Sequence, residues 1–300
     1  MSRITSIFFK ENRKNSVSKS ENPGHIGSLD GIRGVAILMV FAEHYGDIAE
    51  HTHSAPLLFI QHLKSTGWLG VDLFFALSGY LITGILWKTR SDKNRARNFY
   101  AKRVLRLFPV YYGVWFFLLC YSAITSIDWN PRVFLEYLLY AGNFAAPYHI
   151  NIGPFQIVHF WSLAVEEQFY LIWPLLLWNM PSKKSAMRLL AALFSASVLI
   201  KIAYLLLHVN NHAYHYLPTH MEAIASGSFI ALANVERAEV WQRYAKLGLV
   251  ISLPALMIAF AIFHGLNMTK LPVLIVAFPL VAIAASSLIL RSQNPDSFLS

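Results

Sequence analysis

Long apolar stretches recur along most of this 300-residue chain and are separated by short polar segments. Eight of them are long enough to cross a bilayer as helices, because about 20 apolar residues span its hydrocarbon core. The pattern therefore predicts an all-α fold, a polytopic bundle of transmembrane helices within a domain over residues 28–291. We expect the spans near residues 29–47, 67–87, 104–124, 159–179, 186–207, 218–235, 246–264 and 271–290.

A ninth apolar stretch, at 132–147, is shorter and is interrupted by Asn143 and Pro147. The spans on either side of it must run in opposite directions to keep their basic flanks on one side, so this stretch cannot cross alone. We expect a re-entrant or interfacial helix on the outer side. We also expect residues 1–27 to form a disordered cytoplasmic tail, and residues 292–300 a cytoplasmic end.

Composition and charge support a membrane protein and give its orientation. Hydrophobic residues make up 56% of the chain and charged residues only 14%, whereas soluble domains carry about 25% charged residues. Most of the 25 lysines and arginines fall in alternate inter-span segments, which the positive-inside rule places in the cytoplasm. We therefore predict a multi-pass membrane protein with a cytoplasmic N-terminus. Because the basic residues alternate from loop to loop, their distribution is not that of a nucleic-acid-binding surface.

Two ionisable residues of the first span, Arg33 and His44, are a cation and a titratable base set apart along the same helix. Such residues within a membrane usually face a pocket, a pathway or a partner. Their separation of eleven residues places both on nearly one helical face, at depths that differ by about 16 Å. By the predicted orientation, Arg33 lies at the cytoplasmic end and His44 in the outer half of the membrane.

Three carboxylates, Asp72, Glu166 and Glu167, are expected at the same outer depth as His44. A carboxylate beside a histidine can orient it as a general base that takes a proton from a hydroxyl. We therefore predict that Asp72 or one glutamate orients His44. Adjacent glutamates point about 100° apart on a helix, so which of the two acts stays open. The alternative is a structural polar network that only holds the helices together.

Arg103 and Arg106 lie three residues apart, on one face near the cytoplasmic end of the third span. Arginine forks suit phosphates, so together with Arg33 they predict a site for a phosphate-bearing cytosolic ligand. The alternative is lipid contact and topology, which we assign to the other basic residues of that loop. We expect no metal centre, because no carboxylate or cysteine cluster accompanies the outer-loop histidines and Cys120 is the one cysteine.

Small residues within the spans allow close helix packing. We assign that role to two serines and six glycines, and we expect Lys201, in the middle of a span, to face the bundle interior. The small residues are Ser78, Ser162, Gly31, Gly34, Gly67, Gly70, Gly79 and Gly84.

Four ordered blocks resemble the bacterial membrane-bound acyltransferase family 3, the O-acyltransferases of polysaccharides and related exported molecules. They are LDGIRGVAILMVFAEH, GWLGVDLFFALSGYLITGIL, FYAKRVLRLFPVYY and HFWSLAVEEQFYLIWPLLL. The resemblance implies transfer of an acyl group, often acetyl, from cytoplasmic acyl-coenzyme A to a hydroxyl of a carbohydrate or lipid-linked glycan. Acyl-coenzyme A would be a donor substrate, with no permanently bound cofactor, and the protein would lie in the bacterial cytoplasmic (inner) membrane. The resemblance also implies that Arg33 and His44 are essential and that Arg103 and Arg106 contact the donor phosphates.

The chain departs from the family pattern in two places. His220-Met221-Glu222 stands where the family often has Arg-x-Asp, and the family usually continues with two more helices beyond the position of Ser300. Two alternatives to an acyltransferase therefore stay open, namely a small-solute transporter without acyl chemistry and an inactive, truncated member. The acceptor, the acyl chain and the oligomeric state are not predicted.

Overall fold

The computed structural model describes residues 27–44, 54–126, 130–145, 151–152, 155–156, 159–208, 214–233, 238–267 and 270–293. The predicted N-terminal tail thus lies outside the described residues except for Gly27, which begins the first helix. The predicted end at 292–300 is described only at Ser292 and Gln293.

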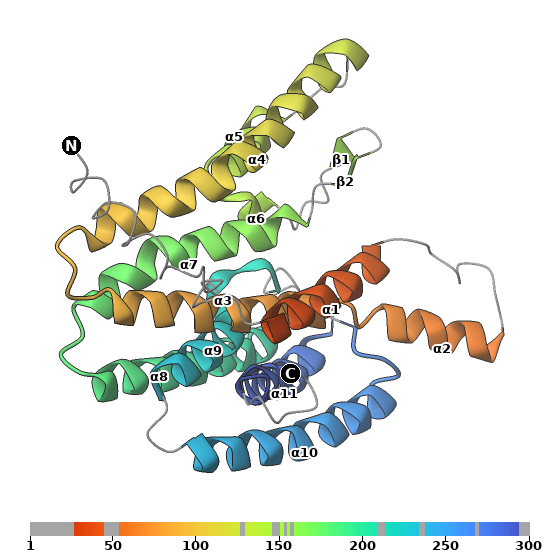
Figure 1. The fold of residues 1–300 in the computed structure, drawn as a ribbon. Coiled ribbons are helices and arrows are strands. Elements are labelled where there is room, and N and C mark those ends of the chain that lie inside the picture. Colours follow the sequence, from red (N-terminus) through yellow and green to blue (C-terminus); the bar gives the residue numbers. More distant parts are fainter. Residues whose placement is uncertain are drawn as a thin grey trace, which may run out of the picture.

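Helices account for almost all of the described structure, which confirms the predicted all-α bundle (Figure 1). The exception is a short antiparallel hairpin that pairs Asn151 with Gln156, which the sequence pattern did not predict. The elements are α1 (Gly27–His44), α2 (Ala55–Lys64), α3 (Leu69–Lys88), α4 (Arg95–Thr125), α5 (Pro131–Leu138), α6 (Gly142–Ala145), β1 (Asn151–Ile152), β2 (Phe155–Gln156), α7 (Phe160–Trp178), α8 (Lys183–Leu206), the 3₁₀ helix η3 (Leu217–His220), α9 (Met221–Ala233), α10 (Ala238–Ile262) and α11 (Leu271–Arg291).

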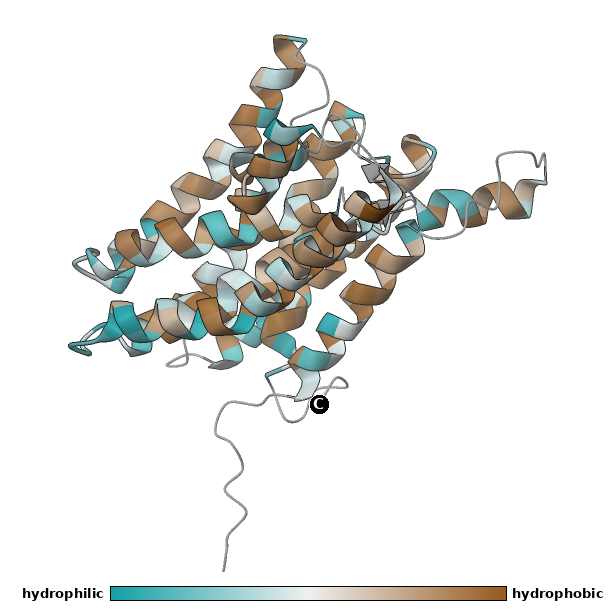
Figure 2. Cartoon of the chain, turned by 90° about the horizontal axis from the view of Figure 1, so that it is seen from above, coloured by the Kyte–Doolittle hydropathy of each residue, from teal (hydrophilic) through white to brown (hydrophobic). Residues whose placement is uncertain are grey.

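Five helical stretches among the described residues are long and apolar enough to cross a membrane, so the chain is a multi-pass membrane protein. These five are α4, α8, α10, α11 and the continuous stretch Ala55–Lys88 through α2 and α3. The other three predicted spans correspond to α1, α7 and α9. The 13 residues of α9 extend only about 20 Å, less than the ~30 Å hydrocarbon core. Hydrophobic residues dominate the long helices (Figure 2).

The centre of the bundle is α3, which packs on α9 most extensively and also on α1, α7 and α11. The α3–α9 contact brings backbones together, since a Cβ atom at Gly79 would overlap the Ile224 carbonyl and one at Gly227 the Ala76 carbonyl. The packing prediction is confirmed for three of the six glycines. It is wrong for the others, because no described residue beyond the glycine's own helical turn has an atom within 4 Å of the Cβ position. The confirmed ones are Gly67, Gly70 and Gly79; the others are Gly31, Gly34 and Gly84.

The predicted non-spanning stretch at 132–147 forms two short helices, α5 and α6, beside α4 and α7 (Figure 1). The Tyr111 hydroxyl of α4 donates to the Tyr137 carbonyl at 2.6 Å. The Gln168 side chain of α7 donates to Asn143 Oδ1 at 2.8 Å. With 8 and 4 residues, neither helix is long enough to cross a membrane alone, and the re-entrant or interfacial position on the outer side stays a prediction.

One end of the bundle gathers the basic residues, and we call it the basic end. The guanidinium of Arg95, at the start of α4, lies 5.2 Å from the ring centroid of Trp178, at the end of α7. Lys183, at the start of α8, borders the same groove as Ala233, at the end of α9. The basic segments that precede α4 and α8 therefore lie at one end of the bundle together with the end of α9, whereas the basic segment at 1–26 lies outside the described residues.

Candidate functional site

Helix α7 brings several of the predicted site residues together along its length. Glu166 Oε1 accepts hydrogen bonds from the Ser78 hydroxyl of α3 and, at 3.0 Å, from the Tyr170 hydroxyl one turn further along α7. Ser78 Oγ also lies 3.0 Å from the Tyr170 hydroxyl oxygen. Ser78 therefore links α3 to α7 through hydrogen bonds, in addition to the packing role expected for it.

Arg103 and Arg106 of α4 lie on the side of Glu166. The Arg103 guanidinium lies 4.9 Å from the ring centroid of Tyr170, and both arginines act electrostatically on the Glu166 carboxylate. Arg33, which we grouped with them, is engaged elsewhere, because its Nη1 atom lies 2.5 Å from Asp30 Oδ1, one turn earlier in α1. The structure thus places the arginine pair opposite the α7 glutamates.

The neighbouring Glu167 has different surroundings, as its position on the helix predicts. Its Oε1 atom is buried without a hydrogen-bond partner among the described residues. It interacts electrostatically with Arg103, and also with Tyr112 and Tyr140 beside it. Glu166 is therefore held by hydrogen bonds, whereas Glu167 keeps an acceptor atom available.

His44, at the end of α1, lies beside His159, the residue before α7, with ring centroids 5.9 Å apart in an edge-to-face arrangement. Its Nδ1 atom lies 2.8 Å from the Val40 carbonyl oxygen. A carbonyl oxygen only accepts, so Nδ1 holds the proton and Nε2 keeps a lone pair in neutral His44. That tautomer can accept a proton from a hydroxyl group.

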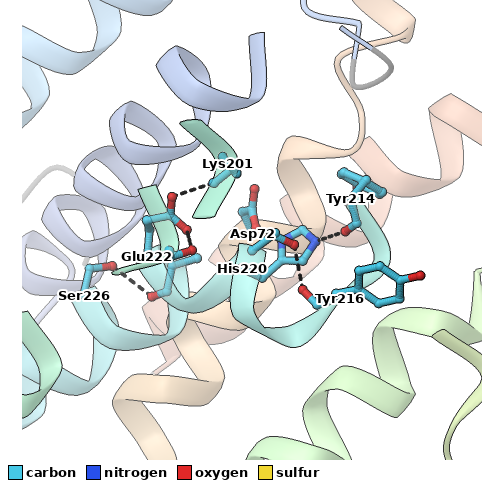
Figure 3. A network of polar contacts seen from close by, with 10 residues as sticks. Asp72, Lys201, Tyr214, Tyr216, His220, Glu222 and Ser226 are labelled. Carbon is cyan, nitrogen blue, oxygen red and sulfur yellow. Dashed lines mark hydrogen bonds and ion pairs between the residues drawn. The ribbon is translucent and has the colours of Figure 1, made fainter. Parts of the chain in front are cut away.

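The structure corrects the predicted partner of His44. Asp72 Oδ1 lies 2.8 Å from His220 Nδ1, and both side chains are buried, with relative exposures of 1% and 0% (Figure 3). His220 Nε2 donates to the Tyr214 carbonyl at 2.5 Å. Asp72 therefore does not orient His44, because the segment before α9 inserts His220 against α3 at the place we expected His44 to occupy.

A second buried ion pair lies beside the first. Lys201 Nζ of α8 lies 2.5 Å from Glu222 Oε1 of α9, and both side chains are buried (Figure 3). The Ser197 hydroxyl donates to the other oxygen of Glu222, and Lys201 Nζ lies 3.9 Å from the ring centroid of Phe278. The expectation that Lys201 faces the bundle interior is confirmed.

Two members of this buried network, His220 and Glu222, are the residues at which the chain departs from the family motif. His220 and Glu222 stand where the family often has Arg-x-Asp, and the sequence pattern predicts no partner for either. A signal for them was present, because ionisable residues within apolar spans are rare and usually pair with one another. Among the described residues, no three His, Cys, Asp or Glu side chains gather as metal ligands would.

Residues 26–299, nearly the whole chain, match the sequence model of an acyltransferase domain, acyltransferase family 3. The chain belongs to this family. The Arg103–Glu166 cluster and the His44–His159 pair therefore lie in an acyltransferase-3 domain.

Curated relatives agree with the family. The chain is 33% identical over 167 residues to the peptidoglycan O-acetyltransferase OatA of Listeria monocytogenes, a match to 50% of this chain and 24% of that protein. It is 27% identical over 233 residues to the O-acetyltransferase OatA of Staphylococcus aureus, with 72% and 36% covered. The putative peptidoglycan O-acetyltransferase YrhL of Bacillus subtilis is 34% identical over 198 residues, with 60% and 28% covered.

The matches thus span at most about a third of these relatives' length. No solved structure matches the chain.

Proposed function

We propose that this chain is an integral-membrane O-acyltransferase that moves an acetyl group from cytoplasmic acetyl-coenzyme A to a carbohydrate hydroxyl on the outer side. Family membership and the O-acetyltransferase names of its relatives support the reaction class. The names of the Listeria and Bacillus relatives favour a peptidoglycan sugar as acceptor.

The observation that carries this proposal is that one helix, α7, reaches both candidate reaction groups. At its start, His159 lies against His44. Seven residues later, about 10 Å along the helix axis, Glu166 meets the electrostatic field of Arg103 and Arg106. The basic end lies beyond, at Trp178. This order suits an extended donor whose phosphates are on the basic side and whose thioester lies near His44.

In the proposed reaction, Arg103 and Arg106 hold the donor phosphates. Neither guanidinium hydrogen-bonds a carboxylate in the described part of the chain, so their N–H donors remain free for phosphate oxygens. The α7 glutamates opposite them limit how strongly the site holds an anion, which favours release of coenzyme A after transfer.

His44 Nε2 then acts as the general base. It takes the proton of the acceptor hydroxyl as that oxygen bonds to the acyl carbonyl carbon, the carbon–sulfur bond breaks, and the proton passes to the departing thiolate. The second route, in which Nε2 itself carries the acyl group for a time, uses the same atom. Arg33 stays a predicted contact of the donor, because it lies on the same helix as His44, α1, and nearer the basic end.

The test uses the full chain in lipid vesicles, with acetyl-coenzyme A supplied on one side and a peptidoglycan fragment on the other. We expect His44→Ala to lower acceptor-dependent thiol release by about 10²–10⁴-fold, the usual contribution of a general base. His62→Ala is the matched control, an exposed histidine of α2, and should retain activity. Unchanged turnover in His44→Ala would overturn the assignment. Solute flux without an acyl donor would favour the transporter alternative.

A further inference from the structure

A groove away from the α3–α4–α7 site runs along α8, α9, α10 and α11. Its apolar part has a volume of about 430 Å³ and is lined by Phe194, Phe229, Trp241 and Ile283, among others. Its second part, of about 460 Å³, lies at the basic end and is bordered by three cations, Lys183, Lys184 and Arg188. Ala191 and Phe229 line both parts, so the two form one continuous groove.

The groove has the polarity of a lipid. Of the described residues, no aspartate or glutamate lines either part. The three cations are exposed. The apolar part is bordered by half-buried Phe194, Phe229 and Trp241 and by two exposed residues, Tyr244 (59%) and Ile283 (39%). The distance along α8 from Lys184 to Ser195, both lining residues, is about 16 Å. A single acyl chain of that length would remain beside apolar atoms throughout.

We propose that this groove binds an anionic phospholipid, with its phosphate at Lys183, Lys184 and Arg188 and one acyl chain along the apolar part. Clusters of lysine and arginine at the cytoplasmic membrane surface attract anionic headgroups, and the apolar part gives one acyl chain a continuous apolar lining from α8, α9, α10 and α11. The site does not depend on the proposed function.

The acyl donor of the proposed reaction does not account for this groove. Arg103 and Arg106, which hold the donor phosphates in the proposed reaction, are on α4, and α4 and α10 lie on opposite sides of the bundle, with α3 and α9 between them (Figure 1). Within the described part of the chain, no arginine or lysine lines the apolar part, so none could hold the phosphates of coenzyme A deeper in the bundle. A lipid, with one phosphate and a long apolar chain, matches the single basic end.

The experiment places the full chain in lipid nanodiscs that contain phosphatidylglycerol or phosphatidylcholine with a photoreactive group on the acyl chain. Peptides that carry the lipid are mapped by mass spectrometry. We expect phosphatidylglycerol to label the lining segments of α8 and α9 about tenfold more than phosphatidylcholine does. The triple variant K183Q/K184Q/R188Q should lower phosphatidylglycerol labelling to the phosphatidylcholine level.

Two further variants separate the groove from general attraction to the membrane. S195W fills the apolar part from an exposed position on α8 and should abolish labelling by both lipids. The control K88Q/K93Q/R97Q removes three exposed cations from the α3–α4 region of the same end, and it should leave labelling unchanged. Equal labelling by the two lipids, or labelling that persists in S195W, would overturn the proposal. Absence of lipid from these segments, as expected if protein fills the groove, would overturn it as well.

Discussion

Removing one partner of the buried Lys201–Glu222 pair should strongly destabilise the protein. Both side chains are buried, with exposures of 0% and 1%, and Lys201 Nζ lies 2.5 Å from Glu222 Oε1. Breaking such a pair leaves an uncompensated buried charge, which costs about 3–5 kcal/mol. For a chain of this size each kcal/mol lowers Tm by about 2–4 °C, so Lys201→Met or Glu222→Gln should lower Tm by roughly 6–20 °C.

The double variant K201M/E222Q tests whether the cost comes from the unpaired charge. With both charges removed, the remaining groups are neutral and of similar volume, and replacing a whole buried pair is often close to neutral in free energy. We therefore expect the double variant to regain most of the lost Tm. An additive loss would show that the two side chains contribute separately, through packing or other contacts.

The measurement is thermal unfolding in detergent, followed by the fluorescence of the eight tryptophans. Dyes that report newly exposed thiols are unsuitable, because the free Cys120 is already exposed in the folded chain. Arg132→Gln is the control, since it breaks the Arg132–Glu136 ion pair, in which the arginine is 84% exposed. Exposed pairs contribute about 1 kcal/mol or less. If Lys201→Met shifts Tm no more than Arg132→Gln, the argument from burial is refuted.

Three other changes have expected outcomes. Gly79→Val should prevent stable folding, because its Cβ would overlap the Ile224 carbonyl. The control Gly84→Ala, whose Cβ would meet no described residue within 4 Å, should retain or slightly raise Tm. Equal Tm values for the two variants would contradict the close packing. The double variant R103Q/R106Q should raise KM for acetyl-coenzyme A at least about tenfold, with a smaller change in kcat. The control R97Q/K102Q, which changes two exposed residues of the same helix, should leave KM unchanged. Equal effects of the two double variants would contradict a specific role of Arg103 and Arg106 in donor binding. Asp72→Asn should lower Tm by several degrees through its effect on His220, and a loss of activity at unchanged Tm would instead indicate a direct role in the reaction.

The sequence predicted the element types well where apolar length decided them. Hydropathy alone predicts the spans that correspond to α8, α10 and α11. The stretch at 132–147 is predicted not to span because the spans before and after it must run in opposite directions. Boundaries were less predictable. Helix α4 begins at Arg95, nine residues before the predicted span, because a helix can continue beyond the membrane into polar sequence that hydropathy does not register.

Site residues were predictable as a set, but their pairing was not. Arg103, Arg106 and Glu166 each stood out as charges near apolar spans, yet only the fold shows that α4 and α7 bring them to one another. The same limit explains the error at Asp72. Depth along a helix could be estimated from a rise of 1.5 Å per residue, but depth alone does not say which neighbour faces a side chain. His44 and His220 satisfied the same depth criterion, and the fold gave Asp72 to His220.

The pairing of Asp72 with His220 changes the role expected for the segment before α9. Through His220 Nε2, the Asp72 carboxylate holds the Tyr214 carbonyl, and Trp161 of α7 stacks on the His220 ring at a centroid distance of 5.2 Å. Burial raises the pKa of Tyr214, and the carboxylates of Asp72 and Glu43 raise it further, which keeps this tyrosine neutral. The segment is thus fixed between α3 and the start of α7. Because Trp161, its contact on α7, lies two residues from His159, the buried network would position the part of α7 that holds the His44–His159 pair.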